Sequence, residues 1–455
     1  MAVLSAVEAM VFFAAVYGAV IARFGTDLAP DTIAELRGAL WPRALLFSAI
    51  MMVCFLAFGL YSLRQRARLA GLALRVAVAL LAGFVITATL FYFVPVLVLG
   101  GGVVALAAIG GLCGVTVSRV IFSHVVDENL FKRRVLVYGA GESAAAIAGL
   151  RRRADRRGFV LTGFVPAHRN ERAVALDRIV DPGESLVGLC ERLGVVEVVV
   201  AMDDRRNGFP IAELLKCRLA GIDVTELLTF LERETGRVRL DVLNPAWLIF
   251  GEGFRRDPLR LINSRFLDVT GSLAVLALTL PIILLTALAL KLQDGWSAPV
   301  LYRQRRVGLG GRPFNVLKFR SMCVDAERDG RPQWAQRRDP RVTRVGSFIR
   351  KTRIDELPQI FNVLRGQMSL VGPRPERPEF VSELAERIPY YLERHCVKPG
   401  ITGWAQLCYP YGSSEQDSLE KLQYDLYYVK NGSLLFDLAI LLQTAEVVVM
   451  GKGAR

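Results

Sequence analysis

The sequence predicts a membrane protein of α plus α/β class, with a four-helix transmembrane bundle, a Rossmann-like parallel α/β domain, and a basic domain attached by a re-entrant helix. Four apolar runs open the chain, a strand–turn–helix pattern follows, and a fifth apolar run precedes a basic, motif-rich segment. Mean hydropathy is +0.36 and 22% of residues are charged. That combination is too apolar for an ordinary soluble enzyme and too charged for a protein lying wholly within the bilayer.

The four opening runs fall at residues 3–22, 44–62, 71–93 and 95–118. Each is near the roughly 20 residues that a helix needs to cross a bilayer. Buried core helices are the alternative, but four such runs in succession disfavour it. Arginines fill the loop after the second run, and basic residues follow the fourth. We therefore expect a bundle over 1–131, with a tight hairpin at Pro95 and both ends in the cytoplasm.

Charge and metal-ligand residues narrow the classes of partner. The net charge is +14, of which +10 falls within residues 255–455, so phosphorylated substrates, anionic lipid and nucleic acid are the candidate polyanions. The seven cysteines form no C-x-x-C pair, and there are only three histidines. A metal, if bound, is expected to be a hard cation held by carboxylates.

Residues 132–254 show the pattern of a small parallel α/β domain. An apolar strand over 134–139 leads to Gly139 and Gly141, which open a helix in the context of a dinucleotide-binding turn. A second apolar strand is expected over 195–201 and a helix over 210–220. The acidic residue that would bind a ribose is missing, since the corresponding stretch reads Val165-Pro-Ala-His168. Weak nucleotide binding and a purely structural or regulatory role both remain open.

The fifth apolar run, over 269–290, has features that disfavour a simple crossing. Pro281 lies at its midpoint, where it removes a backbone hydrogen bond and kinks a helix. Basic residues flank both ends, which favours a helix that enters the membrane and returns to the same side. An ordinary kinked span is the alternative.

An acidic pair, Asp355 and Glu356, precedes a helix predicted over 357–365. Capping of that helix is the simple interpretation. Adjacent carboxylates among several cations are also what Mg²⁺-assisted attack on a phosphate requires, because the metal takes carboxylate and phosphate oxygens while guanidinium groups neutralise charge. The candidate cations are Lys318, Arg320, Arg353 and Arg374. Solvent-facing strand positions are the alternative interpretation of Lys318 and Arg320.

Four motifs carry a family resemblance: Lys318-Phe-Arg-Ser-Met322, Asp355-Glu-Leu-Pro-Gln359, Gly372-Pro-Arg-Pro375 and Lys398-Pro-Gly-Ile-Thr-Gly-Trp-Ala-Gln406. Together they resemble the bacterial sugar transferase family of polyprenyl-phosphate glycosyl-1-phosphate transferases, over about residues 260–452. The order of the parts is similar to the large form of that family. Residues 240–253 are also similar to the subgroup linked to exosortase-associated exopolysaccharide clusters.

The resemblance implies a monotopic catalytic domain over 255–455, on the cytoplasmic face of the bacterial inner membrane. It would transfer a sugar-1-phosphate from a UDP-sugar, with glucose as the first expectation, to undecaprenyl phosphate, releasing UMP. Asp355 would be the nucleophile, Glu356 with Asp355 would hold Mg²⁺, and the four cations above would bind phosphates. Asp268 and Arg265 would anchor the base of the re-entrant helix. The family's Ser-Pro break reads Leu280-Pro281 here.

The sequence leaves two alternative classes of function to compare with a sugar transferase. A membrane-bound sugar-nucleotide dehydratase or epimerase needs a Tyr-x-x-x-Lys pair, which the sequence lacks. A non-catalytic membrane scaffold would explain the basic charge but not the motifs, and we expect no nucleic-acid partner. The tail over 434–450 fits either a helix lying along the interface or a packed core helix. Homo-oligomer formation is left open.

Overall fold

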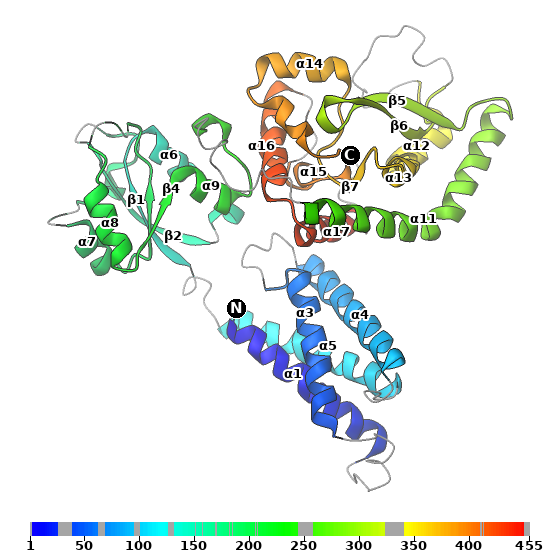
Figure 1. Cartoon of the computed structure of the whole chain (residues 1–455), viewed down its shortest axis with the longest axis horizontal. Helices are drawn as coiled ribbons and strands as arrows, with labels where there is room; N and C mark the ends of the chain where they lie inside the picture. The colour runs from blue at the N-terminus through cyan, green and yellow to red at the C-terminus, as the bar shows by residue number, and fades with distance from the viewer. Residues whose placement is uncertain are drawn as a thin grey trace. The chain divides into compact units, whose positions relative to one another are not determined.

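The computed structural model describes residues 2–25, 39–61, 69–94, 101–125, 132–243, 258–323 and 341–449, apart from single loop positions at 151, 157, 169, 170, 182, 184, 205, 207, 410, 411 and 413. The chain forms two compact units, Met1–Thr235 and Gly236–Arg455. Within the described ranges, five helices are long and apolar enough to cross a membrane. The chain is a membrane protein that also contains an α/β domain with a parallel β-sheet (Figure 1).

The four predicted N-terminal helices are present as α1 (Ala2–Phe24), α3 (Leu40–Ala57), α4 (Leu69–Phe93) and α5 (Gly101–Val125). α1 packs against α3 and α5, and α4 also packs against α3 and α5, so the four close into a bundle. α3 ends before the apolar run does, because the chain turns at Gly59 with φ +67°. The predicted hairpin at Pro95 lies outside the described residues.

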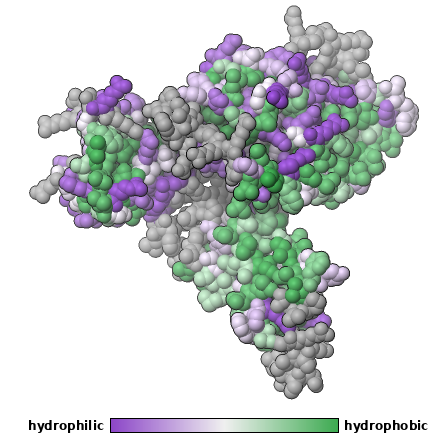
Figure 2. Space-filling model, in the orientation of Figure 1, coloured by the Kyte–Doolittle hydropathy of each residue, from purple (hydrophilic) through white to green (hydrophobic). Residues whose placement is uncertain are grey.

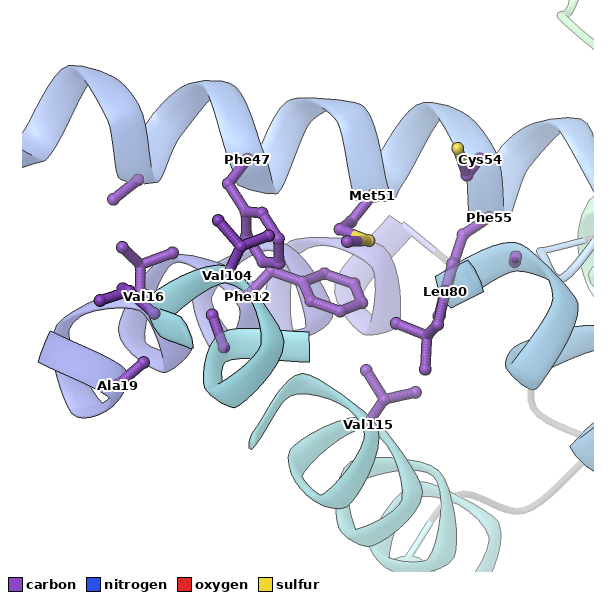
Figure 3. Packing of buried hydrophobic residues seen from close by; sticks show 14 of the residues in the cluster. Phe12, Val16, Ala19, Phe47, Met51, Cys54, Phe55, Leu80, Val104 and Val115 are labelled. Carbon is purple, nitrogen blue, oxygen red and sulfur yellow. The ribbon is translucent and has the colours of Figure 1, made fainter. Parts of the chain in front are cut away.

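The bundle interior is packed by large apolar side chains. In Figure 3, Phe12 of α1 points toward Phe47, Met51 and Phe55 of α3. Phe12 and Phe55 meet edge to face with ring centroids 5.2 Å apart. One ion pair lies within the bundle: the carboxylate of Glu8, which is fully buried, accepts from Arg119 Nε at 2.6 Å. A charge inside apolar helices requires such a partner.

The α/β domain has four parallel strands in the order β2-β1-β3-β4. These are β1 (Arg133–Tyr138), β2 (Phe159–Val165), β3 (Glu197–Val200) and β4 (Asp223–Glu226), connected by α6 (Glu142–Ala148), α7 (Leu186–Leu193) and α8 (Ile211–Leu219) and followed by α9 (Leu227–Thr235). β1 and β3 are central and their apolar residues are buried, which is why they read as uninterrupted apolar runs.

The two compact units divide after Thr235. The boundary that the sequence predicts near residue 254 lies outside the described residues. Residues 236–238, directly after α9, belong to the second unit and are held there by the following contacts. Trp404 Nε1 donates to Gly236 O at 2.8 Å, Val238 N donates to Gln423 O at 3.0 Å, and Arg237 pairs with Glu420. Val238 is buried in that unit's core. No composition change marks this point, so the sequence alone did not reveal the boundary.

The second unit combines a long helix with short strands and helices. Its elements are α11 (Pro258–Asp294), β5 (Leu301–Val307), β6 (Pro313–Phe319), α12 (Arg344–Lys351), α13 (Gln359–Leu364), β7 (Ser369–Val371), α14 (Pro378–Arg387), β8 (Gly400–Thr402), α15 (Trp404–Cys408), α16 (Glu415–Asn431) and α17 (Leu434–Val449). β5 and β6 pair antiparallel, and β7 and β8 pair parallel.

α11 packs on this unit at both of its ends. Near its start, Arg265 donates to Val363 O and Leu364 O at 2.7 and 2.6 Å. Near its end, Leu290 is buried in a cluster with Phe319. Figure 1 shows that α11 bends, and Pro281 lies inside it. Much of the middle is exposed, and Figure 2 shows an apolar surface over this part of the unit.

One side of α17 packs into the protein core, as expected if the tail is a packed helix. Ile440 is fully buried and belongs to the cluster around β7. Leu435 and Val448 on other sides of the helix stay exposed. Asp437, also on α17, is buried where the Tyr428 hydroxyl donates to its Oδ1 at 2.8 Å.

We expect Asp437→Asn to stabilise the protein at neutral pH. Burial raises the pKa of Asp437 to about 6, despite the Tyr428 hydrogen bond and the Arg260 charge, and nearby Asp268 adds to the rise. When folding raises the pKa of a carboxyl group, the folded state is most stable, relative to the unfolded state, below the unfolded pKa of roughly 4. Stability is then lost as the pH rises through the folded pKa of about 6. The gain at pH 7.5 is at most about 3 kcal/mol, measured as thermal unfolding at pH 4.5 and 7.5.

Asp417 provides the control of opposite sign. Hydrogen bonds from Ser414 and Tyr409 lower the pKa of Asp417 to about 2. Asp417→Asn should therefore destabilise at pH 7.5, where the carboxylate caps α16. An Asp437→Asn protein that melts at the wild-type temperature at pH 7.5 would contradict the proposed cost of the buried carboxylate.

Candidate functional site

Asp355 and Glu356 lie in a single 3₁₀ turn, Ile354–Glu356, between α12 and α13. The predicted helix after them is present but begins at Gln359, with Pro358 at its N-cap. The turn is entered through Arg353, a non-glycine residue in the left-handed region with φ 61°. Such a conformation costs free energy and often marks a functional site. The Asp355 side chain in this turn is buried, and the Glu356 side chain is partly buried.

Three of the four predicted cations meet at one oxygen of Glu356. Arg374 Nη2 lies 2.9 Å from Glu356 Oε1, Lys318 Nζ lies 3.1 Å away, and Arg353 Nη1 lies 3.9 Å away. Burial alone would raise the pKa of Glu356, but the charges of Arg374 and Lys318 outweigh burial and hold the pKa well below its usual range. Glu356 is therefore a carboxylate at any physiological pH.

Asp355 has a different environment from its neighbour. It is 9% exposed, and within the described residues its carboxyl group has no recorded hydrogen bond or ion pair. Burial and the adjacent Glu356 charge raise its pKa, which Lys318, Arg350 and Arg353 oppose. Two neighbouring carboxyl groups thus have pKa values moved in opposite directions, a pattern typical of pairs with different chemical roles.

Close backbone contact between two of the motifs positions Arg374. Gly372 N donates to Thr402 O and Gly400 N donates to Pro373 O, each at 2.9 Å. A Cβ on Gly372 would lie 2.4 Å from Lys398 O, and one on Gly400 would lie 2.1 Å from Gly372 N. Only glycine allows this approach. The Gly-Pro-Arg-Pro and Lys-Pro-Gly-Ile-Thr-Gly motifs are therefore two sides of one structure that holds Arg374.

Asn362 and the Arg394–Asp425 pair also hold the site in place, and the sequence did not predict either of them. Asn362, fully buried, accepts from Leu317 N at 2.9 Å and donates to Asn315 O at 2.8 Å, so it ties β6 and Lys318 to α13. Arg394 donates to Arg374 O at 3.1 Å and pairs with buried Asp425 at 2.7 Å. A polar residue inside the apolar helix pattern was the available signal for Asn362. The Arg394–Asp425 pair joins positions 31 residues apart and has no local signal.

Arg320 does not join the other cations. Its Nε donates to Pro299 O at 2.7 Å and its Nη2 pairs with Asp294 Oδ2 at 2.8 Å, so the guanidinium group holds the end of α11. The side chain is 7% exposed. β6 ends at Phe319, and the alternation that would have placed Arg320 beside Lys318 ends with it. In this structure Arg320 therefore anchors the end of α11, and its phosphate-binding role stays a prediction.

Arg265 and Asp268 lie in the first part of α11 and attach it to the rest of the unit. Arg265 donates to two carbonyl oxygens at the end of α13. The Oδ1 atom of Asp268 accepts from Ser369 Oγ and Leu370 N, both at 2.8 Å. The start of α11 is thereby attached to α13 and to β7, the strand that leads into the motif of Arg374.

The glycine turn of the α/β domain is filled by the protein's own carboxylates. Asp203 accepts from Glu142 N at 2.9 Å and Ser143 N at 2.7 Å, at the start of α6. A Cβ on Gly141 would lie 1.9 Å from Asp203 Oδ2. Gly139, with φ +123°, approaches Ala201 O. Amides that would bind a pyrophosphate already have anionic partners, so this arrangement disfavours the weak cofactor-binding role of Gly139 and Gly141.

The acidic pair has oxygen donors for a divalent cation but does not surround one. Within the described residues no cluster of three or more His, Cys, Asp or Glu side chains is placed to hold a metal. Magnesium usually takes only one or two protein carboxylates, with substrate phosphates and water completing its shell. Asp355 and Glu356 therefore fit a magnesium ion that arrives with, or is completed by, a phosphorylated substrate.

Comparison with known proteins identifies the second unit. A family model described as bacterial sugar transferase matches residues 259–451. The UDP-glucose:undecaprenyl-phosphate glucose-1-phosphate transferase of Caulobacter vibrioides is 45% identical over 195 residues, which are 42% of this chain and 72% of that relative. The chain belongs to the bacterial sugar transferase family.

Two other relatives match this sugar transferase over part of their own length. A UDP-N-acetylgalactosamine-undecaprenyl-phosphate N-acetylgalactosaminephosphotransferase of Aeromonas hydrophila is 42% identical over 267 residues, 58% of this chain and 62% of that relative. A UDP-glucose:undecaprenyl-phosphate glucose-1-phosphate transferase of Xanthomonas campestris is 45% identical over 186 residues, 40% of this chain and 38% of that relative. The region matched by the family model contains all four motifs. The relatives' names differ in their sugar.

Proposed function

We propose that the protein transfers a sugar-1-phosphate from a UDP-sugar to undecaprenyl phosphate and releases UMP, as the first membrane step of exopolysaccharide synthesis. Glucose is our first candidate for the sugar. The observation that carries the proposal is the acidic pair, in which Glu356 is bound by Arg374 and Lys318 while Asp355 has no recorded partner. The names of the relatives support the same donor and acceptor classes.

In the proposed reaction, a carboxylate oxygen of Asp355 attacks the phosphorus that carries the sugar. The bond from that phosphorus to the UMP oxygen breaks, and UMP leaves with the electron pair. An oxygen of undecaprenyl phosphate then attacks the same phosphorus, and the Asp355 carboxylate is released. Lys318, Arg353 and Arg374 would bind the phosphate oxygens of the donor. Their convergence on one oxygen of Glu356 supports this proposed role.

Magnesium is part of the proposal, with Glu356 and Asp355 as its protein ligands. A bound Mg²⁺ would neutralise phosphate charge and favour departure of UMP. The chain's own contribution is to keep Glu356 ionised through its cations and to keep Asp355 shielded from water.

We infer that α11 is re-entrant and that the site faces the cytoplasm at the inner membrane. Both ends of α11 are attached to the same compact unit, at Val363 through Arg265 and at Phe319 through Leu290. A helix that crossed the bilayer would separate those two attachments by about 30 Å of hydrocarbon. A nucleotide sugar is cytosolic and the lipid phosphate lies at the interface, so an interfacial site on the inner face serves both.

We expect an impermeant maleimide to leave Cys396 unlabelled in intact spheroplasts and to label it after permeabilisation. Cys396 is exposed and lies in the second unit, so its reactivity reports the side on which that unit lies. The control is Tyr92→Cys, in an otherwise cysteine-free protein, at an 81% exposed position near the outer end of α4. Labelling of Cys396 from outside at the rate of the control would refute the re-entrant arrangement.

The activity itself is tested with the full-length protein in membranes. A panel of UDP-sugars is supplied with undecaprenyl phosphate and Mg²⁺, and UMP is measured. We expect UMP formation with one sugar well above the others, dependent on both lipid and metal. Absence of UMP with every donor, in membranes that contain folded protein, would overturn the proposed function. UDP-glucose and UDP-N-acetylgalactosamine are the two donors that the relatives' names put first.

A further inference from the structure

A cavity lies beside the β5–β6 hairpin and does not include the acidic pair. Its volume is about 380 Å³, and its walls include Arg303, Phe314, Asn315, Leu317, Arg365 and Gln367. None of these residues contributes to the cluster around Glu356. A volume of this size holds a phosphorylated head group, so the chemistry of its walls is the next question.

This cavity and the acidic pair are reached from different residues of β6 and from different ends of α13. Successive side chains of a strand point to opposite faces. Lys318 points to Glu356, and its neighbour Leu317 lines the cavity. Arg303, the partner of Leu317 across the hairpin, lies on that same face. Glu356 precedes α13, whereas Arg365 follows its end. The cavity and the acidic pair therefore lie at opposite ends of α13, with Leu317 and Lys318 on opposite faces of β6.

The two arginines of the cavity differ from the structural arginines of this unit. Arg306, Arg320 and Arg394 each pair with a carboxylate. Arg303 and Arg365 are exposed, and among the described residues neither has a recorded ion pair. The side-chain amides of Asn315 and Gln367 stand beside them. Guanidinium and amide donors together suit the oxygens of a phosphate group, which guanidinium can bind in bidentate fashion.

Hydrogen bonds of Asn362 hold the backbone of β6 and the Gln367 side chain in place at the cavity. Asn362, fully buried, bonds to Leu317 N, to Asn315 O and to Gln367 Oε1, the last at 2.8 Å. It therefore fixes the two strand positions and the Gln367 side chain with respect to α13. Phe314 and Leu317 give the cavity apolar walls, which suit the carbon skeleton next to a phosphate better than a bare ion.

The cavity also lies close to the helix that we place in the membrane. Arg265 of α11 donates to Leu364 O, directly before Arg365. On the same part of α11, Leu261 and Phe266 are 59% and 69% exposed. A phosphate bound between Arg303 and Arg365 would thus lie near an apolar surface that suits lipid tails. Basic groups at that level attract anionic lipids.

We propose that this cavity is a second phosphate-binding site, distinct from the acidic pair, which takes the phosphodiester head group of an anionic phospholipid. The shared chemistry is a phosphate group on a small polar carbon skeleton. A soluble phosphate compound is the other source of that chemistry, and the experiment below separates the two. The site binds the lipid without any covalent step.

The test uses the full-length protein in neutral detergent and native mass spectrometry. Phosphatidylglycerol and phosphatidylcholine with the same acyl chains are added in equal amounts, and bound lipid is counted. We expect preferential retention of phosphatidylglycerol, and a loss of about tenfold in affinity for each arginine removed in Arg303→Gln/Arg365→Gln. Arg305→Gln is the matched control, because Arg305 is an exposed arginine of the same strand that does not line the cavity.

Two further results decide the proposal. Glycerol 3-phosphate or inorganic phosphate that displaces the lipid at millimolar concentration would support the site but assign it to soluble phosphate. Equal retention by wild type and the double variant, or an equal loss in Arg305→Gln, would overturn it. The readout is binding and needs no turnover, so it is independent of the proposed transferase activity. Unchanged thermal unfolding of the variants excludes misfolding, as expected for exposed positions.

Discussion

Replacing Asp355 with asparagine is expected to lower the rate of UMP formation by at least about 10³-fold. The substitution keeps the shape of the side chain and removes the oxygen nucleophile, so the covalent route closes. The fold should survive, because Asp355 has no recorded hydrogen bond that the amide would break. Burial and the neighbouring Glu356 already raise the pKa of this carboxyl group. A neutral amide removes that unfavourable charge, and thermal stability should stay equal or increase.

A trapping experiment separates this role from general damage to the site. Wild-type protein given a UDP-sugar labelled in the phosphate next to the sugar, without undecaprenyl phosphate, should retain label on the chain. Asp355→Asn should retain none. Glu356→Gln is the comparison variant, since it keeps Asp355 but removes the partner of Arg374 and Lys318. It should form the adduct slowly and need more Mg²⁺. Label on Asp355→Asn, or full turnover, would rule out Asp355 as nucleophile.

Local patterns predicted most of the fold because membrane insertion and strand burial act on contiguous residues. The four apolar runs became α1, α3, α4 and α5, with ends displaced by a few residues. The apolar stretch ending at Tyr138 became β1, a central strand. The acidic pair precedes a helix as the spacing indicated. In each case the signal lies within one element, and the physical cause is burial of that element's own side chains.

The surroundings of two predicted site residues have a different origin, since each depends on residues far away in the sequence. Arg320 lies two residues after Lys318, but the strand ends between them and Asp294 draws Arg320 away. The turn at Gly141 has the glycine pattern of a phosphate site, yet Asp203, 60 residues after Ser143, accepts hydrogen bonds from its amides. No window of sequence shows such a partner. The chemistry of a turn therefore has to be judged together with the groups that the fold places against it.

The buried pair Arg394–Asp425 offers the second large effect. Arg394→Met should destabilise the protein by about 3–5 kcal/mol, because it leaves the carboxylate of Asp425 buried without its cation. The two side chains are 7% and 2% exposed, and Arg394 also donates to Tyr391 Oη at 2.8 Å. The double variant Arg394→Met/Asp425→Leu should recover most of that stability, since no unpaired charge remains. Thermal unfolding of the two single variants and the double variant measures the coupling.

Activity in the same variants should not recover with stability. Arg394 is a positioning residue in this scheme, because its Nη2 bonds to Arg374 O and Arg374 in turn binds Glu356. The double variant lacks that bond whatever its stability, so kcat/KM for the UDP-sugar should stay roughly 10–100-fold below wild type, a cost of about 1.4–3 kcal/mol. A double variant that regains both melting temperature and kcat/KM would show that Arg374 is held by the glycine-mediated contact of its own loop alone. A loss in kcat/KM that persists at wild-type stability would place Arg394 in the alignment of the phosphate-binding arginine.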